Sequence, residues 1–544
     1  MEQAAATTVK VADAIAAVMR DYGVRFAFGI PGNSVVDLIR ACEEHGIRFV
    51  LAKSEPAAGF MADAVYQLTG APSVLITTTG PGMANGLTGI AGAQQERTAL
   101  IVLSGEIGSA NLGLHSHQVF DQIAVARPVT KHAATLNPHR AARQMARALD
   151  NALAHPAGPV MFNVPADVSR TSTTALACSR PVPAVTTIEP AQADELRGRI
   201  GAAKRPLALI GRGALVGDAP KAAQRFVRAW RMPFLSTFKA KGVVDEHDPL
   251  CLGAVGLANP FDTQFLKAVR ESDQLVFIGF DPIELQEWWL DAWAPGTPAI
   301  VMDWAGLDQR ALPPATEIYG TLDRTLAALT TADTPRRPDW PLLATIREAT
   351  AALGRPRQSA RAISPAALFA AVDRRLREDW ILAVDTGAHR ITASHVIRCR
   401  SPGQLMQSNG LASMGYGLPA AIGAQFVHPD RTVVALVGDG CMLMTLGELA
   451  VAADNGLPLV VVVVNDASLS LIKVRADKLR QGLSRHATDG ERARFDVVGQ
   501  AFGAHGVRVE TLAAFEAAFD EAVRSRRFTV IDAQVDPAEY AEQM

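Results

Sequence analysis

The stretch of residues 432–473 constrains the fold more than any other part of the chain. Residues 432–437 are a short β-branched run, residues 446–455 have a helical pattern that Gly456 and Pro458 end, and residues 460–464 are five consecutive valines. Five valines in a row are typical of a strand that is buried on both faces of a parallel sheet. A strand–helix–strand unit of this kind crosses over right-handed, so its two strands run parallel.

Asp439 and Asp466 follow the two strands of this unit. Both are therefore expected at the same edge of the sheet, the edge where open α/β sheets bind ligands. Two carboxylates at one edge repel each other unless a cation lies between them, and Mg²⁺ fits because it takes oxygen ligands from one or two carboxylates plus substrate phosphates. Gly438 and Gly440 would let a phosphate approach the backbone. The alternative is an ordinary turn at residues 438–440 and a capping role for Asp466; the second aspartate at a strand end favours the metal site.

Composition limits the class of protein. The 544 residues are 49% hydrophobic and 20% charged with a net charge of −2, which predicts a soluble globular protein of about three domains. No basic run indicates nucleic acid or an anionic membrane. The five scattered cysteines indicate neither a disulfide framework nor a cysteine metal site, so we expect a reducing cytoplasm. We expect no signal peptide and no membrane-spanning segment.

The order of predicted elements indicates an α/β fold of three doubly wound parallel-sheet domains, because strands and helices alternate throughout. The predicted domains cover residues 1–170, 190–335 and 363–544. A stretch rich in Thr, Ser, Ala and Pro at residues 170–192 and one rich in Pro and Arg at residues 333–364 are the predicted connectors. Predicted strands outside the last domain are residues 26–30, 47–51, 73–78, 100–103, 207–210, 274–279 and 299–302, and predicted helices of the first domain include residues 9–22 and 35–45.

The Gly-Asp-Gly turn, followed by a helix, a strand and the pair Asn465-Asp466, resembles the metal–diphosphate motif of thiamine diphosphate (ThDP) enzymes in the acetolactate synthase and 2-oxoacid decarboxylase family. The resemblance implies that Asp439, Asp466 and the backbone carbonyl of Ser468 hold Mg²⁺. It also implies that Gly440 and Cys441 lie against the diphosphate. The three domains would then be the pyrimidine-binding, central and diphosphate-binding domains of that family.

Residues 53–64 open a helix after the predicted strand 47–51. The local sequence alone favours a structural role, in which Ser54 caps the helix and Glu55 complements its dipole. The segment also resembles the family element that carries the catalytic acid. That resemblance implies that Glu55 exchanges a proton with N1′ of the aminopyrimidine and favours the imino form, whose nitrogen removes the proton at C2 of the thiazolium. Residues 79–86 resemble the glycine loop that borders the pyrimidine, with Asn85 as a contact.

Two further segments resemble the family. Residues 407–419 are similar to the segment whose large apolar residue lies between the two cofactor rings and bends the cofactor, which places Met414 there and the carbonyl of Ala412 at the 4′-amino group. The family often has glycine where Ala412 stands. Residues 385–389 are similar to the diphosphate-contacting element, with Gly387 and His389 as candidates. The resemblance implies a homodimer or homotetramer, in which Glu55 of one chain faces the metal site of another.

The substrate-facing residues are less closely matched. Residues 114–122 resemble the acetolactate synthase branch, in which Gln118 would be catalytic. His117 is either a proton shuttle or a solvent-exposed loop residue. Asn33, after a Pro-Gly turn, would face the substrate. Arg475 stands where biosynthetic relatives have a tryptophan, and it either pairs with a substrate carboxylate or is a solvated helix residue.

The reading that these features support is a ThDP- and Mg²⁺-dependent transferase or lyase that acts on a small 2-oxoacid or aldehyde by decarboxylation, carboligation or both. An FAD-containing 2-oxoacid oxidase of the same fold is an alternative, since residues 211–217 have the glycine spacing G-x-G-x-x-x-G, although this spacing does not favour FAD. An aldehyde ligase or lyase is another. A non-catalytic scaffold is disfavoured, because it would need none of Glu55, Met414, Asp439 and Asp466 together.

Overall fold

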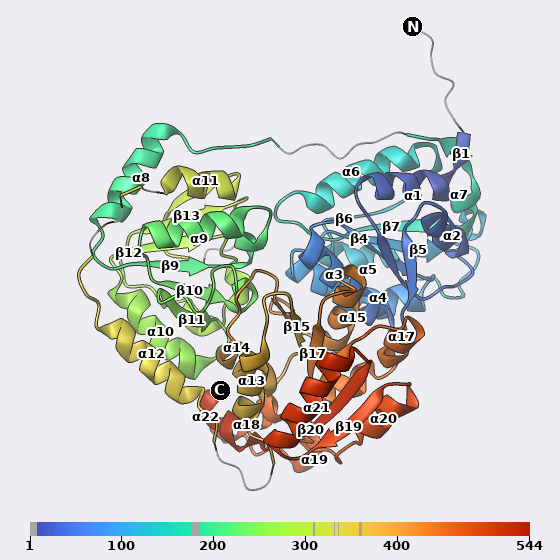
Figure 1. Ribbon diagram of the computed structural model, residues 1–544. Helices are drawn as coiled ribbons and strands as arrows, with labels where there is room; N and C mark the ends of the chain where they lie inside the picture. The colour runs from blue at the N-terminus through green and yellow to red at the C-terminus, as the bar shows by residue number, and fades with distance from the viewer. Residues whose placement is uncertain are drawn as a thin grey trace. The chain divides into compact units, whose positions relative to one another are not determined.

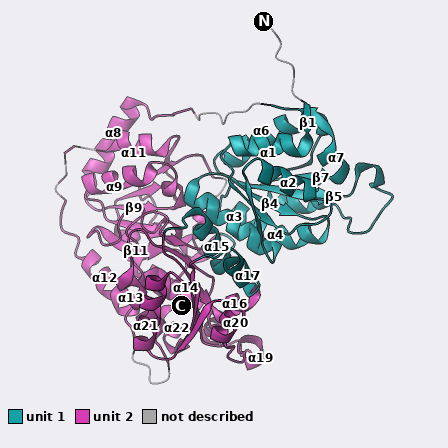
Figure 2. Ribbon diagram, turned by 45° about the vertical axis from the view of Figure 1, so that its right-hand side comes forward, with its two compact units in different colours: residues 1–183, 410–430, 445–457 teal, residues 184–409, 431–444, 458–544 magenta. Residues whose placement is uncertain are grey.

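The computed structural model describes residues 8–176, 184–307, 311–330, 332–333, 335, 337–357 and 362–544. The chain divides into two compact units (Figure 2). Unit 1 comprises residues 1–183, 410–430 and 445–457, and unit 2 comprises residues 184–409, 431–444 and 458–544. Parts of both predicted connectors and Cys178 lie outside the described residues. The three domain boundaries predicted from sequence stay predictions.

Three six-stranded sheets, parallel throughout, form the framework of the described chain (Figure 1). One lies in unit 1 and two lie in unit 2, and each is covered by helices. This arrangement confirms the predicted α/β fold with doubly wound parallel sheets. A short antiparallel pair, β1 (Thr8–Lys10) with β8 (Ser172–Thr174), lies beside the first sheet's helices.

The sheet of unit 1 has the strand order β3-β2-β4-β5-β7-β6. Its strands are β2 (Phe26–Gly29), β3 (Arg48–Leu51), β4 (Ser73–Thr77), β5 (Leu100–Glu106), β6 (His132–Thr135) and β7 (Val160–Pro165). The unit's helices are α1 (Val11–Asp21), α2 (Val36–Glu44), α3 (Glu55–Thr69), α4 (Pro81–Gln95), α5 (Gln122–Ala126), α6 (Ala141–Leu153), α7 (Ala166–Arg170), α15 (Gly417–Val427) and α17 (Glu448–Asp454). Helix α3 packs on β2 and β4, against α4 and α15.

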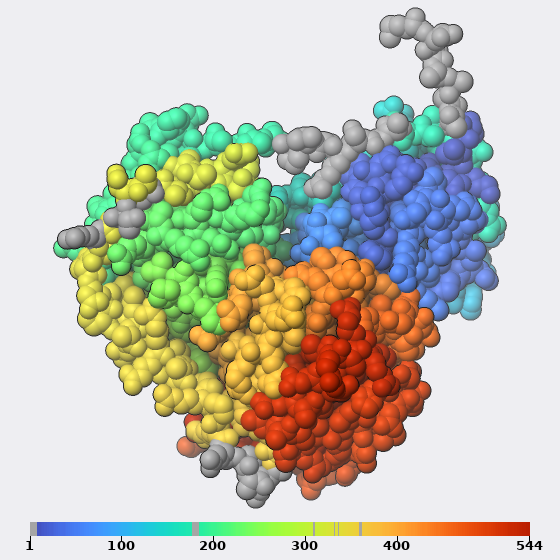
Figure 3. All heavy atoms as spheres, in the orientation of Figure 1, coloured from blue at the N-terminus to red at the C-terminus, as the bar shows by residue number. Residues whose placement is uncertain are grey.

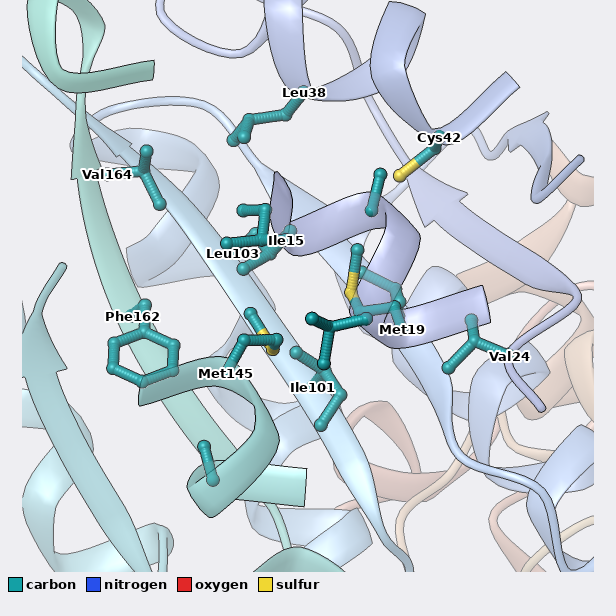
Figure 4. Packing of buried hydrophobic residues seen from close by; sticks show 14 of the residues in the cluster. Ile15, Met19, Val24, Leu38, Cys42, Ile101, Leu103, Met145, Phe162 and Val164 are labelled. Atoms are coloured by element: carbon teal, nitrogen blue, oxygen red, sulfur yellow. The ribbon is translucent and has the colours of Figure 1, made fainter. Parts of the chain in front are cut away.

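The other face of this sheet carries an apolar core of unit 1. Helices α1, α2 and α6 cover it, and their buried side chains meet those of β5 and β7. Figure 4 shows these side chains pointing toward one another, among them Ile15 and Met19 from α1, Ile101 from β5 and Phe162 from β7. All four are at most 1% exposed. The amphipathic pattern of α1 explains this placement, because its apolar residues recur on the side that faces the sheet.

The central sheet, in unit 2, has the strand order β11-β10-β9-β12-β13-β14. Its strands are β9 (Pro206–Ile210), β10 (Phe234–Thr237), β11 (Cys251–Val255), β12 (Gln274–Ile278), β13 (Ala299–Asp303) and β14 (Thr316–Tyr319). One face packs on α8 (Pro190–Ala202), α9 (Ala219–Ala229) and α11 (Leu322–Leu329). The other packs on α10 (Asn259–Glu271) and α12 (Leu342–Leu353).

The third sheet, also in unit 2, has the strand order β16-β15-β17-β18-β20-β19. Its strands are β15 (Ile381–Val384), β16 (Leu405–Met406), β17 (Val433–Gly438), β18 (Val460–Asn465), β19 (His505–Val509) and β20 (Thr529–Gln534). Its helices in unit 2 are α13 (Pro365–Arg375), α14 (Ala388–Val396), α16 (Asp439–Thr445), α18 (Ser470–Lys478), α19 (Arg485–Thr488), α20 (Phe495–Ala501), α21 (Leu512–Ser525) and α22 (Tyr540–Gln543). Figure 3 shows the C-terminal residues, in red, gathered on the surface where α21 lies in Figure 1.

The connection between β17 and β18 differs from the prediction. The sequence predicts that the strand ends at residues 438–440 and that one helix follows over residues 446–455, whereas the structure has two helices, α16 and α17. Asp439 is therefore the first residue of a helix and not part of a free turn. The glycines that suggest a turn are compatible with a helix start, where the first N–H groups have no partner inside the helix.

Within the described ranges, no helix is both long enough and apolar enough to span a membrane.

Candidate active site

Two buried carboxyl groups meet at the carboxyl edge of the third sheet. Strands β17 and β18 are adjacent and parallel, with Gly438 opposite Val464, so that Asp439 and Asp466 leave the sheet at the same end. Asp439 is 9% exposed and accepts a hydrogen bond from the N–H of Gly440 at 2.7 Å. Its carboxylate also receives hydrogen bonds from the backbone of the segment that follows Asp466. The structure thus places Asp439 and Asp466 at the same edge of the sheet, as the sequence predicts.

The loop after β18 is held in one shape by hydrogen bonds. The carboxyl group of Asp466 accepts from the N–H of Ser468 at 3.0 Å and from the hydroxyl of Ser470 at 2.7 Å. The hydroxyl of Ser468 donates to Asp489 at 2.8 Å. Between them Ala467 has a φ of 59°, in the left-handed region that is unfavourable for residues other than glycine. The loop therefore presents the carboxylate and backbone oxygens of residues 466–468 in a fixed geometry.

The electrostatics of the pair favour a cation. Burial, and then the charge of Asp466, raises the pKa of Asp439 to about 7. Burial likewise raises the pKa of Asp466, although the hydroxyl of Ser470 acts in the opposite direction. Within the described ranges, no group of three His, Cys, Asp or Glu side chains could hold a metal ion. A cation at the pair would therefore take its remaining ligands from backbone, water or a bound phosphate, as Mg²⁺ commonly does.

His389 lies against the same strand. It is 5% exposed, and burial, followed by the charge of Arg390, lowers the pKa of its ring to about 3, so the ring is neutral. Its Nε2 is buried and has no hydrogen-bond partner among the residues that the structure describes. A Cβ on Gly438 would stand 3.0 Å from the His389 ring, and a Cβ on Gly387 would stand 2.9 Å from it. Both glycines therefore leave room for a ring whose second nitrogen is available to a ligand.

Two further buried side chains, those of Cys441 and Tyr540, lie near the aspartate pair. Cys441 is 2% exposed, and its Sγ donates to the carbonyl of Thr386 at 3.0 Å. Tyr540, the first residue of α22, is 1% exposed, and burial together with the charges of Asp466 and Asp439 raises the pKa of its hydroxyl. Sequence reasoning missed this tyrosine because it lies far along the chain from the Gly-Asp-Gly turn. No local pattern would have found it.

The candidate acid and its predicted neighbour meet in unit 1. Glu55 begins α3 and is 7% exposed, and the amide of Asn85 donates to its Oε2 at 2.6 Å. The helices that carry the two residues touch through glycine, since a Cβ on Gly59 would stand 2.7 Å from the Cα of Gly89. A small residue at this crossing lets the two backbones approach closely. The structure thus brings together two residues that the sequence connects only through a family resemblance.

The role expected for Ser54 is wrong in one respect. Ser54 precedes α3 with an extended backbone, as an N-cap residue does, but its side chain makes no capping hydrogen bond. Its hydroxyl instead donates to the carboxylate of Glu448, 3.3 Å away. The Ser54 hydroxyl is therefore engaged by an acid from another helix of unit 1 and does not cap α3.

The predicted substrate residues of unit 1 lie at the carboxyl ends of its strands. Asn33, after β2, and His117 and Gln118, after β5, are all exposed. Gln118 has a φ of 60°, and its carbonyl oxygen would stand 2.3 Å from a Cβ on Gly80. His117 lies beside His115, with ring centroids 6.1 Å apart. None of these contacts assigns a chemical role.

Sequence reasoning missed Gln122. It is 1% exposed, and its Oε1 accepts from the N–H of Gly80 at 3.2 Å and from Ser104 at 3.0 Å. Its amide donates to Glu106 at 3.2 Å. Gln122 therefore holds the backbone of the glycine loop, residues 79–86, at Gly80. Gln122 lies with Gln118 in the segment 114–122, and no periodicity there shows which of the two side chains is buried.

The segment 410–416 is anchored to α3 in unit 1. The hydroxyl of Tyr416 donates to Asp63 at 2.8 Å. Ala412 has a φ of 52°, which explains why glycine is favoured at that place in a chain of this kind. Met414 is half-buried. Arg475, on α18 in unit 2, is exposed, and nothing in the structure distinguishes its two readings.

Comparison with known proteins identifies the class. Residues 9–125 match the N-terminal TPP-binding domain of thiamine pyrophosphate enzymes, residues 193–329 match their central domain, and residues 385–533 match their C-terminal TPP-binding domain. The chain belongs to this family and is a thiamine diphosphate-dependent enzyme of the type that catalyses decarboxylation or carboligation. The resemblance stated from the sequence is confirmed.

The relatives narrow the class further. The chain is 28% identical to the large subunit of acetolactate synthase isozyme 2 of Escherichia coli over 530 residues, which cover 96% of this chain and 94% of that protein. It is 29% identical to the acetolactate synthase large subunit of Parasynechococcus marenigrum, over 97% of this chain and 88% of the relative. The Corynebacterium glutamicum large subunit is 29% identical over 85% and 76%. The chain is thus acetolactate synthase-like over nearly its whole length.

The residues of the two units fit the cofactor. The Nε2 of His389, which has no hydrogen-bond partner within the described ranges, suits a diphosphate oxygen. The Asp439–Asp466 pair suits a hard cation that such a diphosphate would share. The carbonyl oxygen of Ser468 accepts no hydrogen bond within the described ranges, which suits it to be a third protein ligand. In unit 1, Glu55 has the carboxyl group that a protonated ring nitrogen requires.

Proposed function

We propose that the protein is a ThDP- and Mg²⁺-dependent enzyme that decarboxylates a small 2-oxoacid and passes the product to a proton or to a second carbonyl compound, as an acetolactate synthase does. The observation that carries the proposal is the buried carboxylate pair of Asp439 and Asp466. Its charges are costly without a cation, and its position at the carboxyl edge of a parallel sheet is where such folds bind phosphates.

Each part of the site has a proposed task. Asp439, Asp466 and the carbonyl of Ser468 would hold Mg²⁺. His389, Gly387, Gly440 and Cys441 would line the diphosphate. The bound cofactor would supply a nucleophilic carbon and accept the electrons that CO₂ leaves behind.

Unit 1 would supply the acid and the substrate side. Glu55 would donate a hydrogen bond or proton to the aminopyrimidine ring, and Asn85, 2.6 Å away, would fix the direction of its carboxyl group. Met414 and the carbonyl of Ala412 would contact the rings. The loop residues Asn33, His117 and Gln118, with Arg475 from unit 2, would face the 2-oxoacid.

The working unit is proposed to be a homodimer or homotetramer in the cytoplasm, in which each site combines the acid of one chain with the metal loop of another. Mixing two inactive variants tests this arrangement. Glu55→Gln and Asp439→Ala subunits, refolded together, should regain up to about a quarter of wild-type activity, because random pairing gives half mixed dimers, each with one intact site. Absence of any regain, with mixed dimers present on native mass spectrometry, would refute the shared site.

The reaction itself is tested directly. The protein loaded with ThDP and MgCl₂ is incubated with a panel of 2-oxoacids, with and without aldehydes, while released CO₂ and ligated products are followed. Glu55→Gln should abolish turnover and still bind the cofactor, because the substitution preserves shape and removes only the ionisable group. Near-normal turnover of Glu55→Gln would overturn the assigned acid.

One observation keeps the FAD-containing oxidase as a second candidate. A cavity of about 540 Å³ lies at the carboxyl ends of β12, β13 and β14, lined by Asp303, Glu317 and Tyr319 among others. The nearby Gly213 is packed so closely on Gly279 that a Cβ would stand 2.8 Å from that residue's Cα. This is the edge where parallel sheets bind nucleotides. Flavin absorbance in the purified protein, with O₂ uptake on adding a 2-oxoacid, would favour the oxidase over the synthase-like reaction.

A further inference from the structure

A buried acid from a second helix of unit 1 binds the backbone that leads into Glu55. Glu448 is the first residue of α17 and is 1% exposed. Its two carboxyl oxygens each accept from the N–H of Lys53 at 3.2 Å, and one also accepts from the hydroxyl of Ser54 at 3.3 Å. Both helices lie in the same unit (Figure 2). The proposed chemistry gives this acid no task.

The contact lies directly before a helix that has no cap from its N-cap side chain. The first N–H groups of a helix have no partner within the helix, and Ser54 does not cap α3 with its own side chain. An anionic group near a helix N-terminus is favoured by the helix dipole. Glu448 lies at the start of α17 and also faces the start of α3, so both dipoles favour its charge. Burial raises its pKa to about 7, although the hydrogen bonds from Lys53 and Ser54 act in the opposite direction.

The backbones at this contact have little freedom to shift. A Cβ on Gly447 would stand 3.2 Å from the Cβ of Lys53, closer than most such contacts. Lys53 is also held at its other end, because its ammonium group pairs with Asp454 of α17 at 3.1 Å. The two residues before Glu55 are therefore held by α17 through a buried carboxylate, and the exposed ion pair at the end of the lysine side chain adds little to this.

We propose that Glu448 is a positioning residue that sets the direction of the Glu55 carboxyl group by holding the backbone of residues 53–54. The inference rests on the proposed role of Glu55. Since Glu55 is the first residue of α3, a rotation of the helix start moves its carboxyl group away from Asn85. A displacement of about 1 Å at a reacting group lowers rates by about a hundredfold.

The test compares three variants in the full-length protein. Glu448→Gln keeps the shape and removes the anion. Asp454→Asn is the matched control, because Asp454 lies on the same helix and contacts the same lysine but is exposed. Ser54→Ala removes one of the hydrogen bonds and serves if Glu448→Gln does not fold. Two readouts are used: hydrogen exchange of the backbone amides in residues 53–58 of the cofactor-free protein, and the rate of proton–deuterium exchange at C2 of bound ThDP with MgCl₂.

Glu448→Gln should speed amide exchange in residues 53–58 while the rest of the chain stays protected, and should slow C2 exchange by about tenfold to a hundredfold. Ser54→Ala should change both in the same direction by less, and Asp454→Asn should change neither. Wild-type C2 exchange in Glu448→Gln, or in Ser54→Ala where the first variant cannot be purified, would overturn the inference. Loss of overall stability with unchanged C2 exchange would also overturn it, because that is the result of a purely structural role.

The variant Glu55→Gln separates this inference from the function on which it rests. If Glu55→Gln exchanges the C2 proton at the wild-type rate, the assignment of the acid fails whatever Glu448 does. If Glu55→Gln loses C2 exchange and Glu448→Gln retains it, the assignment of Glu55 as the acid is supported and only the positioning role of Glu448 is refuted.

Discussion

Replacing Asp439 by asparagine should stabilise the metal-free protein while it removes the metal site. Asparagine has nearly the shape of aspartate and its oxygen can still accept from the N–H of Gly440, but it cannot ionise. Burial and the charge of Asp466 raise the pKa of Asp439 from its ordinary value of 3.8 to about 7. Above that pH, the metal-free protein must therefore hold two ionised carboxylates together at a buried edge.

The size and the pH range of the effect follow from the pKa. In the unfolded chain Asp439 loses its proton near pH 4, and in the folded protein near pH 7. The folded state binds the extra proton between these values, so the stability of the metal-free wild type falls as the pH rises through that window. One pKa unit corresponds to about 1.4 kcal/mol, which gives an upper limit of about 4 kcal/mol. We expect Asp439→Asn to be more stable than the wild type by about 2–4 kcal/mol at pH 8 and equally stable near pH 4.

Urea denaturation of EDTA-treated protein at both pH values measures the difference, and calorimetry measures ThDP uptake with and without MgCl₂. The variant should lose the Mg²⁺ dependence of cofactor binding. Asp489→Asn is the matched control: Asp489 lies in the same loop network, but hydrogen bonds from Lys473 and Ser468 lower its pKa, so its replacement should give no gain at pH 8. A variant at Asp439 that is less stable than the wild type at pH 8, or equally stabilised at both pH values, would refute the reasoning.

Three other substitutions probe separate features of the chain. Ala412→Gly should leave stability in urea denaturation unchanged or raise it by up to about 1 kcal/mol, because φ is 52° at this residue and glycine relieves the strain. A loss of stability of more than about 1 kcal/mol would show that this backbone conformation is not strained. Lys241→Met should destabilise the protein by about 3–5 kcal/mol, because its ion-pair partner Glu246, 2.7 Å away and 3% exposed, loses that partner while it stays buried. Adding Glu246→Leu should restore most of the lost stability. Unchanged stability of the single variant Lys241→Met would show that the pair is not buried in solution. Gly438→Ala should weaken ThDP binding in calorimetry by more than tenfold, because the new methyl group would meet the His389 ring at 3.0 Å. Unchanged affinity would show that the His389 ring does not contact the cofactor.

The sequence predicts those parts of the fold that depend on local pattern. The valine run of β18 and the β-branched run of β17 are strands with bounds close to those expected, because a strand buried on both faces has no polar positions. The parallel crossover between them is also sufficient to place Asp439 and Asp466 at one edge. The start of α16 at Asp439 was missed, since glycines on both sides of an aspartate are equally typical of a turn.

Long-range partners could not be predicted in the same way. Glu448 was read only as part of a helix, and its contact with Ser54 joins residues almost 400 positions apart in the chain. Tyr540, from the last helix, lies near enough to Asp439 and Asp466 for their charges to raise the pKa of its hydroxyl. Gln118 was named from the family resemblance, and the burial of Gln122 was not foreseen, because no local pattern shows which of these side chains packs inside. Such contacts follow from the packing of elements, and a single sequence carries no record of it.

The contact between Gly59 and Gly89 has a consequence for how this enzyme can vary. The two helices touch where neither has a side chain, so their spacing is set by backbone atoms alone. A single methyl group at either glycine would spread the helices and carry the ends bearing Glu55 and Asn85 apart. Activity could thus be lost through a substitution one helical turn or more from any reacting atom, in a variant that still folds and still holds its metal.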